Sequence, residues 1–186
     1  MITNLYFVRH AHSHYSTDEL GRPLSERGLE DAKQITELLQ GENMDVVISS
    51  PYKRAYQTVE GIARKIEKEI ETIDAFKERI LSKEPVADFV EAVLQVWTDF
   101  DFSHPNGESS HNAQSRGVRA TKDILKKYEG QNVVIGTHGN IMVLIMNYFD
   151  PIYDFEFWKQ LEMPDIYQLS FIDQQLIEVK RLGKVS

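Results

Sequence analysis

The sequence contains no cysteine. Disulfide bonds, thiolate metal sites and mechanisms that use a cysteine nucleophile are therefore excluded. No apolar run approaches the roughly 18 residues that a helix needs to cross a bilayer. The start, MITNLYFVRH, has neither the basic segment nor the small-residue cleavage site of a signal peptide. These absences predict a cytoplasmic protein that works with side chains other than thiols.

Positive charge is also scarce. The 186 residues include 21 lysines and arginines against 29 aspartates and glutamates, a formal net charge of −8. Such a chain repels polyanions on average, so neither nucleic acid nor an anionic membrane is an expected partner. A small anion still fits, provided that positive side chains gather in one pocket. With no repeat or linker, residues 1–186 are expected to form one domain, and the oligomeric state is left open.

Short apolar runs alternate with amphipathic segments along the chain. Strands are expected at residues 2–8, 44–50, 71–76 and 132–136, with a hairpin of 166–172 and 176–182 around Asp173-Gln174. Helices are expected from Ser25 to about Gly41, from Ser50-Pro51 onward, and over 86–97, 109–128 and 141–149. This alternation is typical of an α/β fold with three α/β/α layers around a mostly parallel central sheet.

Two serines are expected to cap helices. Ser25 precedes apolar residues at helical spacing, and Ser50 is followed by Pro51, a residue typical of a first helical turn. The apolar face of the first helix is expected to comprise Leu29, Ala32, Ile35, Leu38 and Leu39.

Charged and polar residues follow the ends of the expected strands, where ligands collect in parallel sheets. Arg9 and His10 follow the first strand, and Arg54 lies in the first turn after the second. Glu78 comes just after 71–76, and His138 follows the strand NVVIG. Two arginines, two histidines and a carboxylate are therefore expected at one edge of the sheet.

This set of residues suits phosphoryl transfer. Arginine offers a planar fork of donors that matches phosphate oxygens and stays charged at any useful pH. Nearby arginines favour a neutral, nucleophilic histidine, and helix N-termini add backbone N–H donors. Glu78 would then supply the proton that a leaving alkoxide needs.

A metal site is the alternative interpretation of the segment FVRHAHSHYS. His10, His12 and His14 would share a face of an extended chain, and imidazoles at such spacing can bind zinc. Against it, Arg9 and Arg54 would sit beside a dication, and no cluster of Asp or Glu follows another strand end. The phosphate interpretation is favoured, and no metal or other cofactor is expected. His12 and His14 are expected in a polar surface loop.

Three segments in order resemble the signature motifs of the histidine phosphatase, or phosphoglycerate-mutase-like, superfamily. They are VRHAHS at 8–13, SSPYKRAYQT at 49–58 and GTHGN at 136–140. The resemblance implies that His10 is phosphorylated, that Arg9 and Arg54 clamp the phosphate, and that His138 stabilises charge through hydrogen bonds. It also places Glu78 where the family has its general acid, and implies the family's fold.

Other segments refine the resemblance. DELGRPLSERG at 18–28 is similar to a loop of small phosphatase members with an Arg-His-Ala signature, which Ala11 matches. Ser16 and Gly139 are implied to contact substrate, although Ser16 stands where asparagine is common. Gly107-Glu108-Ser109 with Arg116 resembles a supporting helix start. The region 79–115 is expected to form a cap that determines substrate specificity.

The expected function is that of a metal-independent phosphatase acting on a small phosphorylated metabolite. Phosphoglycerate-mutase-type transfer is an alternative, but the stretch after Glu78 offers only Arg79 and Lys83 to retain an acidic intermediate. The second alternative is a non-catalytic module that binds a phosphate ligand or a protein. The presence of both arginines and both histidines favours the enzyme.

Overall fold

The computed structural model describes residues 1–183 and contains one six-stranded sheet in the order β3-β2-β4-β1-β5-β6. The strands are β1 (Ile2–Arg9), β2 (Val46–Ser49), β3 (Ile70–Thr72), β4 (Asn132–Thr137), β5 (Asp165–Ile172) and β6 (Gln175–Arg181). The first four pair in parallel, whereas β5 is antiparallel to β1 and β6 is antiparallel to β5. The carboxyl ends of the four parallel strands therefore meet at one edge.

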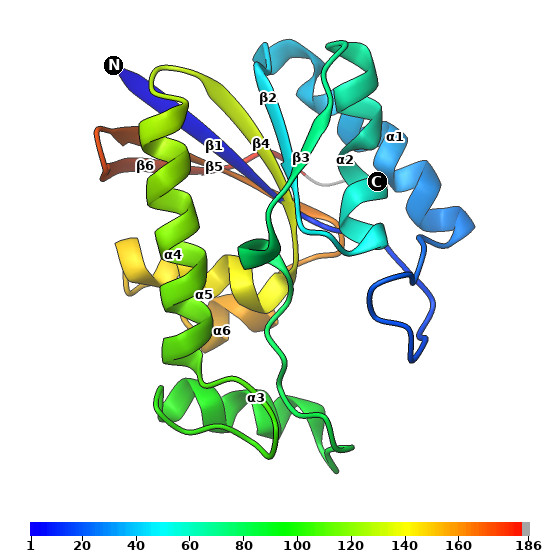
Figure 1. Cartoon of the computed structure of the whole chain (residues 1–186), viewed down its shortest axis with the longest axis vertical. Helices are drawn as coiled ribbons and strands as arrows, with labels where there is room; N and C mark the ends of the chain where they lie inside the picture. The colour runs from blue at the N-terminus through cyan, green and yellow to red at the C-terminus, as the bar shows by residue number, and fades with distance from the viewer. Residues whose placement is uncertain (184–186) are drawn as a thin grey trace.

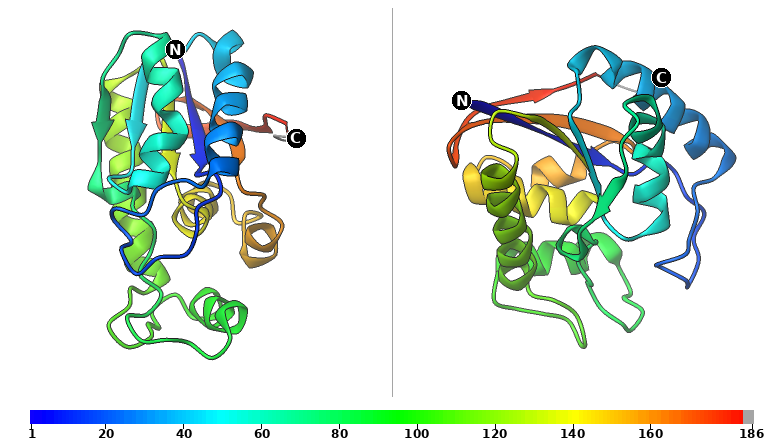
Figure 2. Two further views of the ribbon diagram at one scale, coloured as in Figure 1. Left: turned by 90° about the vertical axis from the view of Figure 1, so that its right-hand side faces the viewer. Right: turned by 45° about the horizontal axis from the view of Figure 1, so that its top comes forward.

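Helices cover both faces of this sheet (Figure 1). They are α1 (Glu26–Leu38), α2 (Lys53–Lys65), α3 (Phe89–Thr98), α4 (Ser110–Lys127), α5 (Gly139–Phe149) and α6 (Phe155–Lys159), with short 3-10 turns η1 (Leu39–Glu42) and η2 (Asp74–Phe76). Helices α1 and α2 pack on one face, and α4, α5 and α6 on the other. Helix α3 lies beyond the carboxyl ends of the strands (Figure 2), and its residues Val93, Val96 and Trp97 belong to the same core as α4 and α5.

The central strands are buried on both faces, which is why each of the parallel ones contains an apolar run: 5–8 in β1, 46–48 in β2 and 133–135 in β4. Along β1, Leu5 and Phe7 belong to the core beneath α4 and α5. Tyr6 and Val8 point the other way, into the core beneath α1 and α2. This period of two is what a strand dictates. The three-layer α/β/α architecture and the C-terminal hairpin are as predicted.

The predicted strand at 71–76 is wrong in its second half. Strand β3 pairs with β2 for only three residues, Ile70–Thr72. Beyond Ser49 the partner strand ends and the chain turns toward α2, so no ladder remains to extend β3. The chain instead forms η2, which buries Phe76 completely; the Phe76 carbonyl accepts a hydrogen bond from Thr137 Oγ1 at 2.8 Å.

Several details of the predicted helices are also wrong. Ser50 does not cap α2, whose N-cap is Tyr52 without a side-chain bond, because the Ser50 hydroxyl lies 2.8 Å from a histidine nitrogen. Leu29 and Leu38 are exposed rather than core-facing on α1. Helix α3 begins three residues later than predicted, capped by Asp88. Helix α6 was not predicted. Ser25 caps α1 as expected.

Within residues 1–183, no helix is long and apolar enough to span a bilayer. The same residues also contain no group of three or more His, Asp or Glu side chains placed so that they could bind one metal ion. His12 instead bonds to Ser25 Oγ at 2.7 Å, at the N-cap of α1, and its ring packs edge-on against His14.

Candidate active site

The sheet register brings the predicted residues to one edge. Arg9, the last residue of β1, is paired with Thr137, the last residue of β4. The next residues along the two strands are His10 and His138, whose rings meet edge-on with centroids 5.2 Å apart. Their proximity follows directly from the parallel pairing of β1 with β4.

The His10 ring is held with one nitrogen available for reaction. Its Nδ1 lies 2.7 Å from the Ala11 carbonyl oxygen, which can only accept, so Nδ1 carries the proton. The other nitrogen, Nε2, is therefore an acceptor, and Arg54 Nε donates to it at 3.3 Å. A lone pair on Nε2 is what a nucleophilic imidazole requires.

Burial keeps His10 neutral. The residue is only 6% exposed, and burial lowers the pKa of His10 to about 3. The Ala11 hydrogen bond opposes this shift, whereas the positive charges of Arg54, Arg9 and Arg22 add to it. The imidazole is therefore unprotonated at neutral pH, before any phosphate brings compensating negative charge.

His138 is fully buried beside His10. Its Nε2 lies 2.8 Å from Ser50 Oγ, and the Tyr52 ring packs against it at a centroid distance of 5.1 Å. Burial lowers the pKa of His138, and the neighbouring His10 and Arg54 lower it further. Its Nδ1 has no hydrogen-bond partner among residues 1–183, so one polar atom of this buried ring remains available to a ligand.

Arg54 reaches the site from the first turn of α2 and lies beneath Tyr52, whose ring centroid is 4.9 Å from the guanidinium carbon. Besides its bond to His10, it donates to the backbone carbonyl of Glu19 at 2.8 Å and to the Glu19 carboxylate at 2.9 Å. Arg54 is therefore fixed between His10 and the loop that follows β1.

Arg9 approaches from β1. Its Nη1 donates to the carbonyls of Leu161 and Glu162 at 3.3 and 3.1 Å, whereas its buried Nε has no partner within the described part of the chain. A Cβ on Gly139 would lie 3.0 Å from this Nε, so glycine allows the guanidinium to pass the N-terminus of α5. This close approach is the structural role that we see for Gly139.

Glu78 binds the N-terminus of α5. One carboxylate oxygen accepts from the backbone N–H groups of Arg79 and Ile141 at 2.8 and 2.9 Å, and the other accepts from Asn140 at 3.0 Å. Because α5 starts directly after His138, these bonds bring Glu78 to the same edge of the sheet as both histidines. A carboxylate at a helix N-terminus is also favoured by the helix dipole.

The segment that carries Glu78 is clamped by α4. Arg116 donates to the backbone carbonyls of Ala75 at 2.6 Å and Lys77 at 3.0 Å, and both oxygens of Glu108 accept from the same guanidinium. Glu108 in turn accepts from the backbone N–H of Ile80 at 3.0 Å. Ion pair and backbone bonds together fix the chain on both sides of Glu78. Glu108 and Arg116 thus do support this segment, as the resemblance implied.

A cavity of about 580 Å³ opens beside these residues. It is lined by Tyr15, Ser16, Thr17, Glu19, Tyr52, Glu78, Arg79, Ile80, Leu81, Ser82 and Lys83. Ser16 is half-buried at its wall, and its Oγ accepts from the Asp18 backbone N–H at 3.2 Å. Tyr52 connects the cavity to the deeper site, because its ring contacts both His138 and Arg54.

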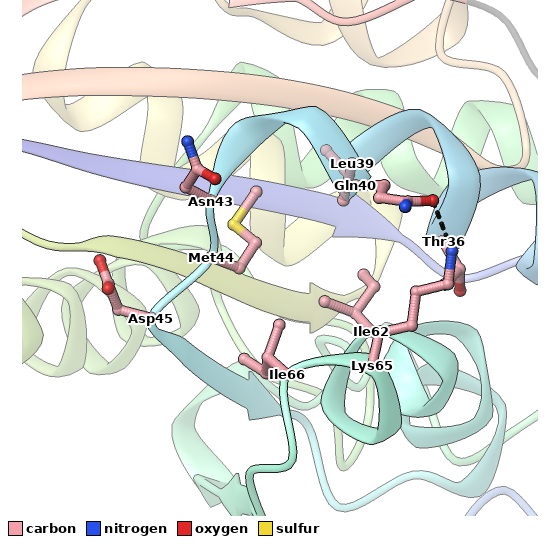
Figure 3. Close-up of a pocket in the computed structure, with 9 residues that line it drawn as sticks. All are labelled: Thr36, Leu39, Gln40, Asn43, Met44, Asp45, Ile62, Lys65 and Ile66. Carbon is pink, nitrogen blue, oxygen red and sulfur yellow. Dashed lines mark hydrogen bonds between the residues drawn. The ribbon is translucent and has the colours of Figure 1, made fainter.

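A second cavity, of about 560 Å³, lies at the opposite end of the sheet (Figure 3). It is formed by η1, the start of β2 and the last turn of α2, where Lys65 donates to Gln40 at 2.6 Å. None of the residues predicted for the site lines it. The cavity at the carboxyl ends of the strands is therefore the one that matters for the candidate chemistry.

Ser50 and Tyr52, which contact His138, were not predicted as site residues. Glu19 and Arg22 were not predicted either. Arg22 contributes to lowering the pKa of His10 and of His138, and its Nη1 lies 3.5 Å from the Glu19 carboxylate. Both residues belong to the polar loop before α1, which has no periodic pattern. The signal in the sequence is the basic residue of GRPLS, within the segment 18–28 that resembles a phosphatase loop, and that resemblance gives Arg22 no role.

Known proteins resemble this chain in sequence and in fold. The chain is 30% identical over 158 residues to phosphoserine phosphatase 1 of Hydrogenobacter thermophilus, covering 74% of this chain and 71% of the relative. Its fold resembles that of a phosphoserine phosphatase from Entamoeba histolytica, with 19% identity, 94% of each chain covered and a TM-score of 0.76. A mycobacterial glucosyl-3-phosphoglycerate phosphatase gives 18% identity, 97% coverage of each chain and a TM-score of 0.76.

The model of the histidine phosphatase superfamily, branch 1, matches residues 5–180, which is most of the chain. This match and the relative at 30% identity confirm the predicted enzyme class, a phosphatase acting on phosphomonoesters. The chain belongs to the histidine phosphatase superfamily.

Proposed function

We propose that the protein hydrolyses phosphomonoesters in two steps, with the phosphoryl group carried on Nε2 of His10. The observation that carries this proposal is the state of the His10 ring. Its Nδ1 proton is donated to the Ala11 carbonyl, so the Nε2 lone pair is available beside Arg54. Low pKa and fixed orientation are the two properties that make a histidine nitrogen a competent nucleophile.

In the first step the Nε2 lone pair attacks phosphorus, an N–P bond forms and the ester P–O bond breaks. Glu78 must enter this step as the carboxylic acid. The leaving alkoxide takes its proton, which leaves the carboxylate that accepts the backbone N–H bonds of Arg79, Asn140 and Ile141. In the second step Glu78, now a carboxylate, removes a proton from water as the water oxygen attacks phosphorus. The N–P bond then breaks and its electron pair returns to His10, so inorganic phosphate leaves and both residues regain their starting states.

Charge on the phosphoryl oxygens would be stabilised by Arg9, Arg54 and Arg22, with His138 as a further hydrogen-bonding group. Arginine forks suit this task because they bind phosphate oxygens in a fixed geometry and act most strongly where water is excluded. The unpartnered Nε of Arg9 and Nδ1 of His138 are buried polar atoms that a phosphoryl group can satisfy. No divalent metal or other cofactor is needed in this scheme.

The site favours water as the acceptor of the phosphoryl group. A mutase would instead transfer the group to a hydroxyl of a phosphoglycerate-like acid. Of the two basic residues after Glu78, Arg79 is 4% exposed and donates to Ser110 Oγ and the Glu108 carbonyl. Its guanidinium is therefore engaged in structure, which leaves Lys83 as the basic residue of that segment at the cavity. A mutase that must retain an acidic intermediate would need more positive charge there.

We further propose that the substrate is a small phosphorylated metabolite and that the cytoplasm is its location. The cavity holds charges of both signs, with Glu19 on one loop and Lys83 on another, which fits a substrate carrying more than a phosphate. Named relatives act on phosphoserine and glucosyl-3-phosphoglycerate, so these two esters lead the set to be tested. Residues 79–115 would form the specificity-determining cap of a single domain, 1–186, whose last three residues lie outside those described.

The decisive first test is hydrolysis of an aryl phosphate by the wild-type protein and by His10→Ala. The wild type is expected to release phosphate, and His10→Ala is expected to release none above background. A non-catalytic module would show no turnover in either protein. A panel of phosphometabolites that includes phosphoserine and 3-phosphoglycerate then ranks substrates, and 2-phosphoglycerate formed faster than phosphate would identify a mutase instead.

A further inference from the structure

We propose that Glu19 is an exchangeable counter-ion of Arg54 that weakens the affinity of the site for phosphate and so promotes release of the product. This inference rests on the proposed role of Arg54 as a phosphate ligand. The Glu19 carboxylate lies 2.9 Å from Arg54 Nη2 and 3.5 Å from Arg22 Nη1. One carboxylate thus contacts two of the three arginines at the site.

The two partners of the Arg54–Glu19 pair differ in burial. The Arg54 side chain is 3% exposed, whereas that of Glu19 is 51% exposed. A buried guanidinium needs an anion because an unpaired charge away from water is costly. A half-exposed glutamate loses little when it leaves, because water can solvate its carboxylate. Glu19 is therefore a counter-ion that another anion can replace.

The loop around Glu19 is anchored without its carboxylate. Arg54 Nη1 donates to the Glu19 backbone carbonyl at 2.8 Å, and the Lys53 backbone N–H donates to the Leu20 carbonyl at 2.9 Å. Within the loop, Gly21 N–H donates to the Asp18 side chain at 2.9 Å. These contacts hold the backbone in place, so rotation of the Glu19 side chain alone is enough to free Arg54 Nη2, while Nη1 stays bonded to the Glu19 carbonyl.

A phosphoryl group on His10 and the Glu19 carboxylate would compete for the same positive charge. Arg54 bonds to His10 through Nε and to Glu19 through both terminal nitrogens. An arriving phosphate must either displace the carboxylate or bind next to a like charge, and both reduce its affinity. Without Glu19, three arginines around a buried site would retain inorganic phosphate more tightly.

The test compares inorganic phosphate binding by the wild type, Glu19→Gln and the matched control Glu26→Gln. Glu26 is an exposed residue of α1 whose substitution removes the same charge from the same part of the chain. Affinity is measured by titration calorimetry and by competitive inhibition of aryl phosphate hydrolysis at fixed ionic strength. Glu19→Gln is expected to bind phosphate about fivefold more tightly, the upper range for releasing a part-exposed ion pair.

The control Glu26→Gln should bind phosphate as the wild type does. Unchanged or weaker binding by Glu19→Gln would overturn the inference and make Glu19 a residue that merely orients Arg54. An equal gain in both variants would also overturn it, since the cause would then be net charge. The variant Arg54→Ala distinguishes a failure of this inference from a failure of the proposed function. If it binds phosphate with wild-type affinity, Arg54 is not a phosphate ligand and its proposed role is wrong.

Discussion

The two carboxylates at the site, Glu78 and Glu19, are held in opposite ways. Glu78 accepts three backbone hydrogen bonds, two of them from α5. Its own segment is clamped by Arg116 and Glu108. The Glu19 side chain is half-exposed, and among residues 1–183 its carboxylate contacts only the side chains of Arg54 and Arg22, which a phosphate would also bind. A carboxylate that transfers a proton must keep its position, whereas one that serves as a counter-ion must be replaceable.

The largest effect expected from this comparison comes from Glu78→Gln. Loss of the general acid should slow hydrolysis of alkyl phosphates by about 10²–10⁴-fold, and that of an aryl phosphate much less, because a phenolate leaves without a proton. The measurement is kcat/KM for one ester of each kind. Glu19→Gln is the contrasting variant, and it should change kcat/KM for the alkyl and the aryl ester by the same factor. An equal loss for both esters in Glu78→Gln would make Glu78 a structural carboxylate.

A smaller effect is expected from the clamp. Arg116→Met should release the chain around Glu78 and slow alkyl phosphate hydrolysis about tenfold, since misplacement of a catalytic group by a fraction of an ångström is costly. The loss should again be greater for the alkyl than for the aryl ester, with partial recovery in Arg116→Lys. Arg119→Met, at an exposed position of the same helix, is the control. A loss that is independent of the leaving group would indicate general destabilisation.

The buried histidines should make stability depend on pH. Burial lowers the pKa of His10 to about 3 from an ordinary value of 6.5, so between these values the unfolded chain binds a proton that the folded chain does not. Acidification therefore favours unfolding, and the free energy of unfolding should fall by up to about 1.4 kcal/mol per pH unit for this residue. Denaturant titrations at pH 7 and pH 5 measure the slope, which should be shallower in His10→Asn. An unchanged slope would show that His10 is not held neutral by the fold.

No effect at all is expected from removal of divalent metal. The arginines already supply the positive charge that a metal ion would provide in phosphoryl transfer. Turnover should therefore persist after dialysis against a strong chelator. Activity that disappears and returns with added zinc would contradict this and revive the metal interpretation of His10, His12 and His14.

The sequence was most informative where burial dictates pattern. Strands β1, β2 and β4 are covered on both faces, so each contains an apolar run, and the end of the run is visible as the first polar residue after it, Arg9 in β1 and Ser49 in β2. Because parallel strands end at one edge, the proximity of His10 and His138 could be predicted without coordinates. The fold class followed from the same alternation.

The sequence was least informative where position depends on distant partners. The loop with Glu19 and Arg22 is polar and aperiodic, and it is placed by bonds to α2 that no local pattern encodes, such as Lys53 N–H to the Leu20 carbonyl. Ser50 looked like a helix cap because its sequence neighbours permit one, but its hydroxyl is bonded to His138, 88 residues away. The short β3 likewise ends where its partner strand ends.

The central claim, that Nε2 of His10 carries the phosphoryl group, can be tested directly by trapping the intermediate. The wild type is mixed with labelled substrate, quenched within milliseconds without acid, and digested for mapping of the labelled peptide. The account predicts an acid-labile, base-stable phosphate on the peptide that contains His10, formed no more slowly than turnover and missing from His10→Ala. Label on another residue, or a phosphoprotein that still forms in His10→Ala, would contradict it.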